Sequence, residues 1–306
     1  MANRKRKGRE ISGWLCLDKV VGQTSTQAVS GVKRLYNAAK AGHAGTLDPL
    51  ATGILPIALG DATKTVPFAQ DGRKVYRFTV KWGIATDTDD SEGKPVATSD
   101  ERPDRDTIEA VLPLFTGEIM QRPPAYSAIK IDGERAYDLA REGQDVVIAE
   151  RSVVVHRLEL TEIPGADHAI FDAECGKGTY VRAIARDIGQ RIGCFAHVVA
   201  LRRLVVGPFG ETGAIGLEEL ADARGENGAE TLDRFLQPVG VVLGDLPEIV
   251  LAPGDAARVR RGQTVFLKGR DAPAVTGMVH ATHAGETIAI GEVERGAFNP
   301  KRVFRT

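Results

Sequence analysis

Residues 42–53 read GHAGTLDPLATG and set one carboxylate, Asp48, and one imidazole, His43, among three glycines and a proline. Glycine permits backbone angles that are closed to other residues, and Pro49 pushes the residue before it toward an extended conformation. The pattern therefore predicts a shaped loop that presents Asp48. Aspartate at an N-cap followed by proline at the first helical position is also common, so a helix cap at Asp48 remains an open alternative.

Length and composition predict a soluble globular protein. The 306 residues suggest one large or two modest domains, and 42% hydrophobic with 26% charged residues fits a protein with a real core. No apolar run reaches the roughly 18 residues that span a bilayer, and the basic start lacks an apolar segment, so we expect no secretory signal. The three cysteines are far apart and odd in number, which argues against disulfides and a cysteine zinc site and favours the cytoplasm.

The formal net charge of −1 neither establishes nor excludes an RNA partner, because the clustering of basic residues matters more than their sum. Each basic cluster taken alone is more often a solvated surface than a phosphate contact. The clusters are Arg4-Lys5-Arg6-Lys7 with Arg9, Arg202-Arg203, Arg258 with Arg260-Arg261, and Lys268 with Arg270.

Hydrophobic periodicity predicts interleaved strands and helices. In residues 74–82, Tyr76, Phe78 and Val80 alternate with polar residues, which is typical of a half-buried strand. Thr24 and Ser25 offer N-caps for a helix that follows them. Further strands are expected at residues 13–19, 152–160 and 169–175, and further helices at 106–115 and from 181 to 192. The irregular order indicates an α+β fold around a mixed sheet.

The segment after Gly244 predicts a separate small β-rich domain, because short strand-like runs alternate with glycine and proline. We therefore expect a larger domain at residues 1–244, with a basic tail at 1–10, and a second domain at 245–306. The expected strands of the second domain are residues 249–251, 264–267, 274–279, 287–293 and 302–304.

Arg182 breaks a local rule. It lies in the first turn of its expected helix, where the helix dipole disfavours cations. Such violations tend to mark functional sites, and a carboxylate such as Asp48 would compensate this one. A solvated arginine is an equally open reading. The preceding GKGT, residues 176–179, is not a phosphate-binding loop, because the upstream glycine of that motif is Phe171 here.

Five motifs occur in order over about residues 10 to 210: the Asp48 loop, Tyr76-Arg77, PPAYSAIK at residues 123–130, GKGTYVR at 176–182, and His197 with LRRL at 201–204. Together they resemble the TruB family of tRNA pseudouridine synthases. The sequence departs from the family pattern at Val20, where the family usually has proline, and at Ala44, where threonine is frequent; both departures concern turn geometry only. The C-terminal part resembles a PUA-type RNA-binding module more faintly, at residues 291–293 and 302–304.

The resemblance implies a pseudouridine-synthase catalytic domain around a mixed, largely antiparallel sheet, with a PUA-like C-terminal domain. It implies a bacterial stand-alone enzyme that isomerises uridine 55 in the T loop of tRNA. Because the reaction gains and loses no atoms, no cofactor, metal or nucleotide is expected. The implied partner is the T arm and elbow of tRNA, with no membrane and no obligatory protein partner, and the enzyme is expected to be a cytoplasmic monomer.

The resemblance also implies roles for individual residues. Asp48 is the nucleophile or assists deprotonation of the sugar, Tyr76 stacks on the flipped base and supplies a hydroxyl, and Arg182 pairs with Asp48. Asp90 is expected to orient Arg182. The other expected residues are His43, Tyr180 and Leu201 in the substrate pocket, and Lys19, Ser127, Lys130 and Arg202 as RNA contacts or supports. A non-catalytic RNA-binding protein and a guide-RNA-dependent relative remain alternatives, as do a covalent ester and a glycal intermediate.

Overall fold

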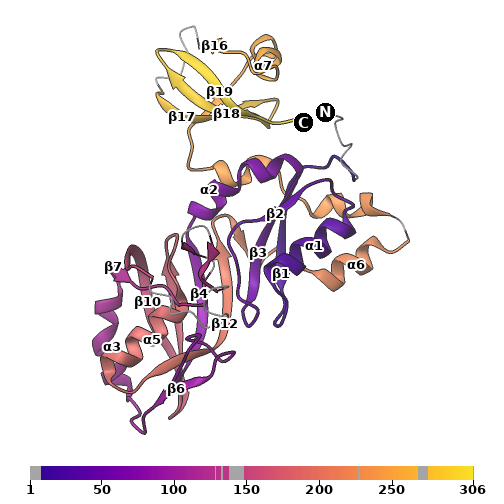
Figure 1. The fold of residues 1–306 in the computed structure, drawn as a ribbon. Helices are drawn as coiled ribbons and strands as arrows, with labels where there is room; N and C mark the ends of the chain where they lie inside the picture. The colour runs from indigo at the N-terminus through magenta and orange to yellow at the C-terminus, as the bar shows by residue number, and fades with distance from the viewer. Residues whose placement is uncertain are drawn as a thin grey trace.

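The structure is a computed structural model that describes residues 8–127, 129–131, 134–137, 148–226, 228–267 and 275–305. Two sheets organise this part of the chain, a large one built from most of the first 216 residues and a small one formed after residue 247 (Figure 1). The basic residues 1–7, and Lys268 with Arg270, lie outside the described residues.

The large sheet contains strands from both halves of the first 216 residues, with helices and short 3₁₀ segments between them. In chain order, the elements up to residue 121 are β1 (Gly13–Lys19), α1 (Ser25–Leu35), β2 (Ala41–His43), β3 (Thr52–Leu59), a 3₁₀ turn (Gly60–Lys64), α2 (Val66–Asp71), β4 (Lys74–Trp82), β5 (Ile84–Thr86), β6 (Pro95–Thr98), α3 (Arg105–Val111), a 3₁₀ turn (Leu112–Phe115) and β7 (Gly117–Gln121). Then follow β8 (Lys130–Ile131), β9 (Glu134–Arg135), β10 (Arg151–Gly165), β11 (His168–Cys175), α5 (Val181–Ile192), β12 (Ala196–Val206), β13 (Phe209–Gly210), β14 (Ile215–Gly216), α6 (Leu217–Arg224) and two 3₁₀ segments (Ala229–Phe235 and Val239–Leu243).

The strand order of the large sheet is β14-β1-β3-β12-β4-β11-β10-β7, with β2 added beside β3 and β13 beside β12. Only the β1–β14 and β3–β12 neighbours run parallel within it; the other described pairs are antiparallel. This confirms the expected α+β fold around a mixed, largely antiparallel sheet. The short hairpins β5–β6 and β8–β9 stand apart from that sheet.

Apolar side chains bury the central strands under the helices. Helices α3 and α5 lie together over the β4–β12 half, and α1 and α6 lie together beside β1 and β3 (Figure 1). Phe78 of β4 stacks on Phe171 of β11 with ring centroids 5.3 Å apart, and Ile184 and Ile188 of α5 are fully buried in the same core. Burial of these side chains positions α5 and its arginines over the centre of the sheet.

The small sheet has its own apolar core, centred on Ile288 and Phe298, and still touches the larger part. Lys64 Nζ donates to the Val303 carbonyl at 2.7 Å, and the amide of Arg305 donates to Asp61 at 2.7 Å. The proposed domain boundary at residue 245 stays a prediction. The elements here are β15 (Glu248–Val250), α7 (Pro253–Val259), β16 (Val265–Phe266), β17 (Gly277–His283), β18 (Glu286–Glu294) and β19 (Ala297–Val303), in the order β15-β17-β18-β19-β16.

Most expected elements are present, with a few differences. Thr24, rather than Ser25, caps α1, through a capping box with Gln27. The helix expected at 106–115 ends at Val111 and tightens into a 3₁₀ turn around Pro113, which lacks the N–H that an α-helix needs. In the small domain, α7 was not expected, and the strand expected at 302–304 is the end of the longer β19.

Gly53 is required where β3 meets β12. Its φ is +98°, and a Cβ at this position would lie 2.2 Å from the Arg203 carbonyl oxygen. Gly22 also has a positive φ, +79°, but a Cβ there would meet no atom within 4 Å. The two glycines therefore separate the conformational cost of a side chain from the steric cost.

We expect Gly22→Ala to lower the free energy of unfolding by about 1 to 2 kcal/mol, the cost of a left-handed alanine. Gly53→Ala should lose about 1 to 3 kcal/mol more, because the backbone of β12 must move. Urea unfolding followed by circular dichroism measures both. Equal losses in the two variants would contradict the close approach of β3 and β12.

Candidate active site

The Asp48 loop joins β2 to β3 and is tied to the N-terminal elements on both sides of Asp48. The Ser25 hydroxyl exchanges hydrogen bonds with the backbone N–H and C=O of Leu47, each at 2.9 Å. The amide of Gly22 donates to the Pro49 carbonyl at 2.8 Å. No helix begins at Pro49: a turn follows, in which Ala51 N–H donates to the Asp48 carbonyl at 3.1 Å. The helix-cap alternative is therefore wrong, and Asp48 is presented by a fixed loop.

Lys19 supports this loop through its buried ammonium group. It is fully buried, and its Nζ donates to the carbonyls of Val20 (2.9 Å), Gln23 (2.8 Å) and Pro49 (3.4 Å). Burial lowers the pKa of Lys19 to about 8, an effect that the nearby Asp48 charge opposes. Three carbonyl acceptors satisfy all three donors of the ammonium. This places Lys19 as a support of the loop, away from the surface.

Arg203 holds the loop from the sheet side, and sequence reasoning missed it. Its guanidinium is buried and donates to the carbonyls of Ile54 (2.7 Å), Gly45 (3.1 Å) and Thr46 (3.3 Å). The sequence placed Arg203 in a basic cluster and in the LRRL motif at residues 201–204, but neither gave it a role at the Asp48 loop. Which of the adjacent arginines faces inward depends on strand register, which the sequence did not reveal.

Tyr76 lies directly opposite Arg203 in the β4–β12 pairing. Residues opposite each other on one face of an antiparallel pair have their side chains in reach of one another. Burial raises the pKa of Tyr76 above its ordinary value, and the positive charge of Arg203 opposes this. The phenol is therefore protonated at neutral pH.

Arg182 bridges two carboxylates from different segments. Its Nε lies 2.9 Å from Asp48 Oδ2, and its Nη1 lies 3.2 Å from Asp90 Oδ2. The remaining donors reach the carbonyls of Thr88 (2.8 Å) and Tyr126 (2.9 Å). Only 4% of the Arg182 side chain is exposed, against 32% of the Asp48 side chain. The unfavourable position of Arg182 in the first turn of α5 is thus compensated by two anions.

Asp90 is held as firmly as the arginine it contacts. Its Oδ1 accepts from the Thr88 hydroxyl (2.6 Å) and from the amide of Glu92 (3.0 Å), and its side chain is 3% exposed. The Asp90 oxygen that faces Arg182 is therefore fixed by local turn contacts. The expected alignment Asp48–Arg182–Asp90 is present.

Burial raises the pKa of Asp48 above its ordinary value. Arg182, and more weakly Arg203 and Lys19, oppose the shift, while Asp90 adds to it. An ionised carboxylate that lacks full hydration is more basic than one in water. Asp48 thus combines partial exposure with the raised basicity that suits a nucleophile or a base.

Other expected residues take different positions. Leu201 is buried opposite Phe78 in the β12–β4 pairing. Tyr180 precedes α5, its backbone exchanges two hydrogen bonds with the Gln121 side chain (2.8 and 3.1 Å), and its ring lies 5.2 Å from the Arg151 guanidinium. Sequence reasoning also missed Gln121, whose buried side chain fixes Tyr180.

His43 and Ser127 lie in segments next to the site. His43 ends β2, opposite Ile57 of β3, and is partly buried. Ser127 is buried, and its hydroxyl has no hydrogen-bond partner within the described part of the chain. It follows Tyr126, whose carbonyl binds Arg182.

Of the two remaining expected RNA contacts, one is shown to lie away from this cluster. Arg202 points away from the face that Arg203 occupies and pairs with Asp18 (2.8 Å) and Glu211 (2.7 Å). The side chain of Lys130 lies outside what the structure describes.

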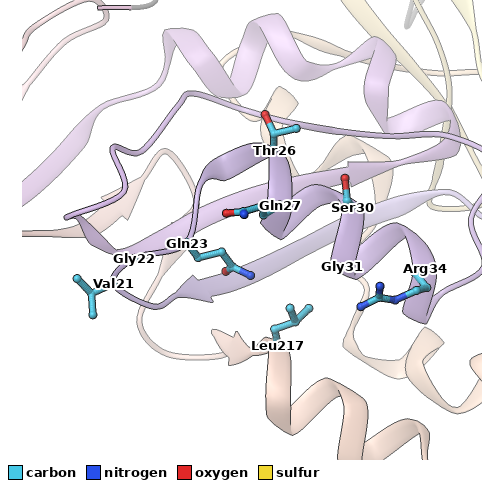
Figure 2. A pocket seen from close by; sticks show the side chains of 9 residues that line it. All are labelled: Val21, Gly22, Gln23, Thr26, Gln27, Ser30, Gly31, Arg34 and Leu217. Atoms are coloured by element: carbon cyan, nitrogen blue, oxygen red, sulfur yellow. The ribbon is translucent and has the colours of Figure 1, made fainter. Parts of the chain in front are cut away.

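An open groove of about 690 Å³ lies along α1, and Asp48 is not one of the residues that line it (Figure 2). Its walls are short polar side chains of α1, such as Gln27 and Ser30, with Leu217 of α6 facing them. Arg34 is its single charged lining residue, and it is exposed. The groove lacks buried, converging charges, which distinguishes it from the Asp48 cluster.

Comparison with known families decides the assignment. Residues 33–181 match the N-terminal domain of the TruB family of pseudouridylate synthases, and residues 182–243 match the tRNA pseudouridylate synthase B C-terminal domain. The chain belongs to the TruB family. The tRNA pseudouridine synthase B of Nitrobacter winogradskyi is 57% identical over 302 residues, covering 98% of this chain and 84% of that protein. The protein of the same name from Agrobacterium fabrum is 55% identical over 307 residues, covering 99% and 97%. This TruB-family chain is a pseudouridine synthase, an isomerase.

Solved structures agree with the fold. A chain of a Cbf5-Nop10-Gar1 complex superposes with a TM-score of 0.75 at 28% identity, covering 96% of this TruB-family chain and 85% of that one. A chain of an H/ACA RNP bound to a substrate RNA containing 2'-deoxyuridine gives a TM-score of 0.74 at 26% identity, covering 100% and 92%.

The described residues contain neither a membrane-spanning helix nor a cluster of metal-binding side chains. Among the helices they form, none is long and apolar enough to cross a membrane. Within the same residues, no three His, Cys, Asp or Glu side chains are grouped to hold a metal ion.

The opposing effects on Asp48 lead to a pH prediction. In Arg182→Gln the largest opposing charge is lost, so we expect the pKa of Asp48 to rise further above its ordinary value. The acid side of the pH–rate profile should then move to higher pH. NMR titration of ¹³C-labelled aspartate measures the shift, and circular dichroism checks the fold. Arg191→Gln, an exposed change on the same helix, should leave the Asp48 pKa unchanged; an unchanged or lower value in Arg182→Gln would contradict the ion pair.

Proposed function

We propose that this TruB-family enzyme converts uridine 55 in the T loop of tRNA to pseudouridine, as a stand-alone enzyme. One observation carries the proposal. The partly exposed carboxylate of Asp48, on the loop between β2 and β3, lies 2.9 Å from the buried guanidinium of Arg182 in α5. Bacterial relatives over 50% identical across nearly the whole chain bear the name tRNA pseudouridine synthase B, which supports tRNA as the substrate.

The reaction follows from what Asp48 can do. The ionised oxygen either attacks C1′ or removes a proton from the sugar, and the electron pair of the N1–C1′ bond leaves with the uracil. The uracil then turns so that C5 bonds to C1′, and the carboxylate is released or returns its proton. The proton lost from C5 is balanced by one gained at N1, so the product is an isomer of the substrate.

The flipped base requires a platform, and Tyr76 is the candidate. Extruding a base costs a few kcal/mol, and stacking on an aromatic ring returns roughly 1 to 3 kcal/mol. Leu201 lies on the same face of the sheet, two residues before Arg203. The Tyr76 hydroxyl is also the candidate group for removing the C5 proton once the base is stacked; because it is protonated at neutral pH, it takes up that proton only as its own proton passes to water.

The rest of the molecule supplies RNA affinity in this proposal. A catalytic domain at residues 1–244 and a PUA-like domain at 245–306 divide the work, and the second family match ends at residue 243, close to that boundary. His43, Tyr180 and Ser127 flank the pocket. We place this monomeric enzyme in the cytoplasm.

A guide-RNA-dependent enzyme is the second candidate, because the solved structures that match include an H/ACA RNP and a Cbf5-Nop10-Gar1 complex. Their identity to this chain is 28% or less, against 57% for a curated bacterial relative. Activity of the purified chain on a tRNA transcript alone separates the two candidates.

We expect purified wild-type protein to form pseudouridine at position 55 of an unmodified tRNA transcript, mapped by carbodiimide-dependent reverse-transcription stops. Asp48→Asn should form no detectable product and still bind the tRNA in a filter assay, because it loses the charge and keeps the shape. Asp18→Asn is the matched control, since Asp18 pairs with Arg202 on the other face. Product from Asp48→Asn would remove Asp48 from the mechanism, and no product from the wild type would refute the function.

Two substitutions separate the ring of Tyr76 from its hydroxyl. Tyr76→Phe keeps the stacking surface, so tRNA affinity should be unchanged while single-turnover rates fall by about 100-fold or more, the usual effect of losing an acid–base group. Tyr76→Leu should also weaken binding of the flipped base, by about 5- to 160-fold for a loss of roughly 1 to 3 kcal/mol. A fully active Tyr76→Phe would exclude the hydroxyl from proton transfer.

A further inference from the structure

Helix α5 presents two arginines one turn apart, and each pairs with a neighbouring aspartate of the same loop. Arg182 pairs with Asp90, as described above, and Arg186 Nη1 lies 2.9 Å from Asp89 Oδ2. Positions four apart on a helix share a face, so both arginines point at the loop. The Arg186–Asp89 pair has low exposure, with 17% of the arginine and 12% of the aspartate side chain accessible.

The backbone of the β5–β6 loop is strained so that both carboxylates reach α5. Successive side chains of an extended chain point in opposite directions, yet those of Asp89 and Asp90 contact the same helix. The change of direction occurs at Asp89, whose φ is +60°. A left-handed conformation costs a non-glycine residue roughly 1 to 2 kcal/mol, so other contacts must hold it.

The contacts that hold this loop come from two sides. On the sheet side, Val198 N–H donates to the Asp89 carbonyl (3.1 Å), and Ser91 N–H donates to the Val198 carbonyl (2.9 Å). On the helix side, the side-chain hydrogen bond that Asp89 makes within the described residues comes from Arg186. Without it, the described residues leave the strained residue tied only through its backbone.

Arg186 also contacts the segment that follows β7, where it donates to the carbonyl of Arg122 (2.7 Å). Within its own helix it donates to Asp187 (2.8 Å). Arg182 in turn binds the Tyr126 carbonyl in that same segment. The two arginines of α5 therefore join the Asp90 loop to residues 122–126 at two successive points.

We propose that Arg186 and Asp89 form a positioning pair that holds the β5–β6 loop so that Asp90 meets Arg182 and Arg182 meets Asp48. The pair acts through Asp90 and touches no reacting atom. This inference rests on the proposed function, because its effect is on the rate of pseudouridine formation.

Electrostatics support a role other than stability. Burial raises the pKa of Asp89 to about 6; Arg186 and Arg182 oppose the shift, and Asp187 adds to it. Because the folded-state pKa lies above the ordinary value, the protonated form is the one that stabilises the fold. That contribution is lost as the pH rises through about 6. At neutral pH the ionised carboxylate lowers stability, as groups kept for function often do.

The test is a double-mutant cycle with Asp89→Asn, Arg186→Gln and the combined variant, assayed on the tRNA transcript at pH 7.5 under single turnover. We expect each variant to lose about 10- to 100-fold in rate, the usual effect of a misplacement of about 1 Å. The dissociation constant for tRNA should stay within about twofold, because no pocket residue is changed. The combined variant should lose no more than the worse single one, since both remove the same contact.

Three controls separate positioning from folding. The combined variant should melt within a few degrees of the wild type, because replacing both partners of a buried pair is often neutral. Arg186→Lys keeps the charge without the planar fork and should recover part of the rate. Arg191→Gln, exposed on the same helix, should react like the wild type.

Wild-type rates in the combined variant, or a rate loss that only follows a fall in melting temperature, would overturn the positioning role. Either result leaves the proposed function intact, because the wild-type protein serves as its separate test.

Discussion

The Asp48–Arg182 ion pair is the interaction around which this molecule is arranged. It joins a loop between β2 and β3 to the first turn of α5, two segments more than 130 residues apart, and it places a cation at a helix N-terminus where the dipole opposes it. Such a pair persists only if both partners are held rigidly, because isolated surface pairs contribute little. Ser25 and Lys19 fix the loop, while Asp90 and two carbonyls fix the arginine.

Two effects of opposite sign set the pKa of Asp48: burial raises it and nearby cations lower it. Three cations, Arg182, Arg203 and Lys19, surround Asp48, yet burial still raises the pKa of this carboxylate. A carboxylate in water would be a weaker base, and one fully paired would be poorly available to a substrate. Partial exposure of Asp48 beside a buried guanidinium meets both requirements. Burial also lowers the pKa of Lys19 to about 8, and its ammonium donates to three backbone carbonyls that support the loop.

Residue type and local spacing predicted the strand that carries Tyr76 and pointed to Asp48 and Arg182, with other readings open for both. Asp90 was a hypothesis built on Arg182, and Leu201 came only from the family resemblance, since β12, which carries it, was not among the expected strands. None of this gave the roles of Arg203, Ser25 and Gln121, whose contacts are to backbone groups distant in sequence. Arg202 and Arg203 illustrate the reason. The two are chemically identical and adjacent, and a shift of one residue in strand register would exchange their faces. The register that places Arg203 opposite Tyr76 belongs to the β4–β12 pairing.

Three local features follow from the sequence alone: the shaped Asp48 loop with its glycines and proline, the capping box of α1, and the alternation of β4. Each of them depends only on neighbours within a few residues. The sequence also carried the motifs of the TruB family. The folded arrangement alone established which arginine turns inward, that Asp89 bends the β5–β6 loop toward Arg186, and that Pro49 opens a turn instead of a helix. Those outcomes depend on packing α5 against a sheet whose strands come from distant parts of the chain, and no local pattern encodes that geometry.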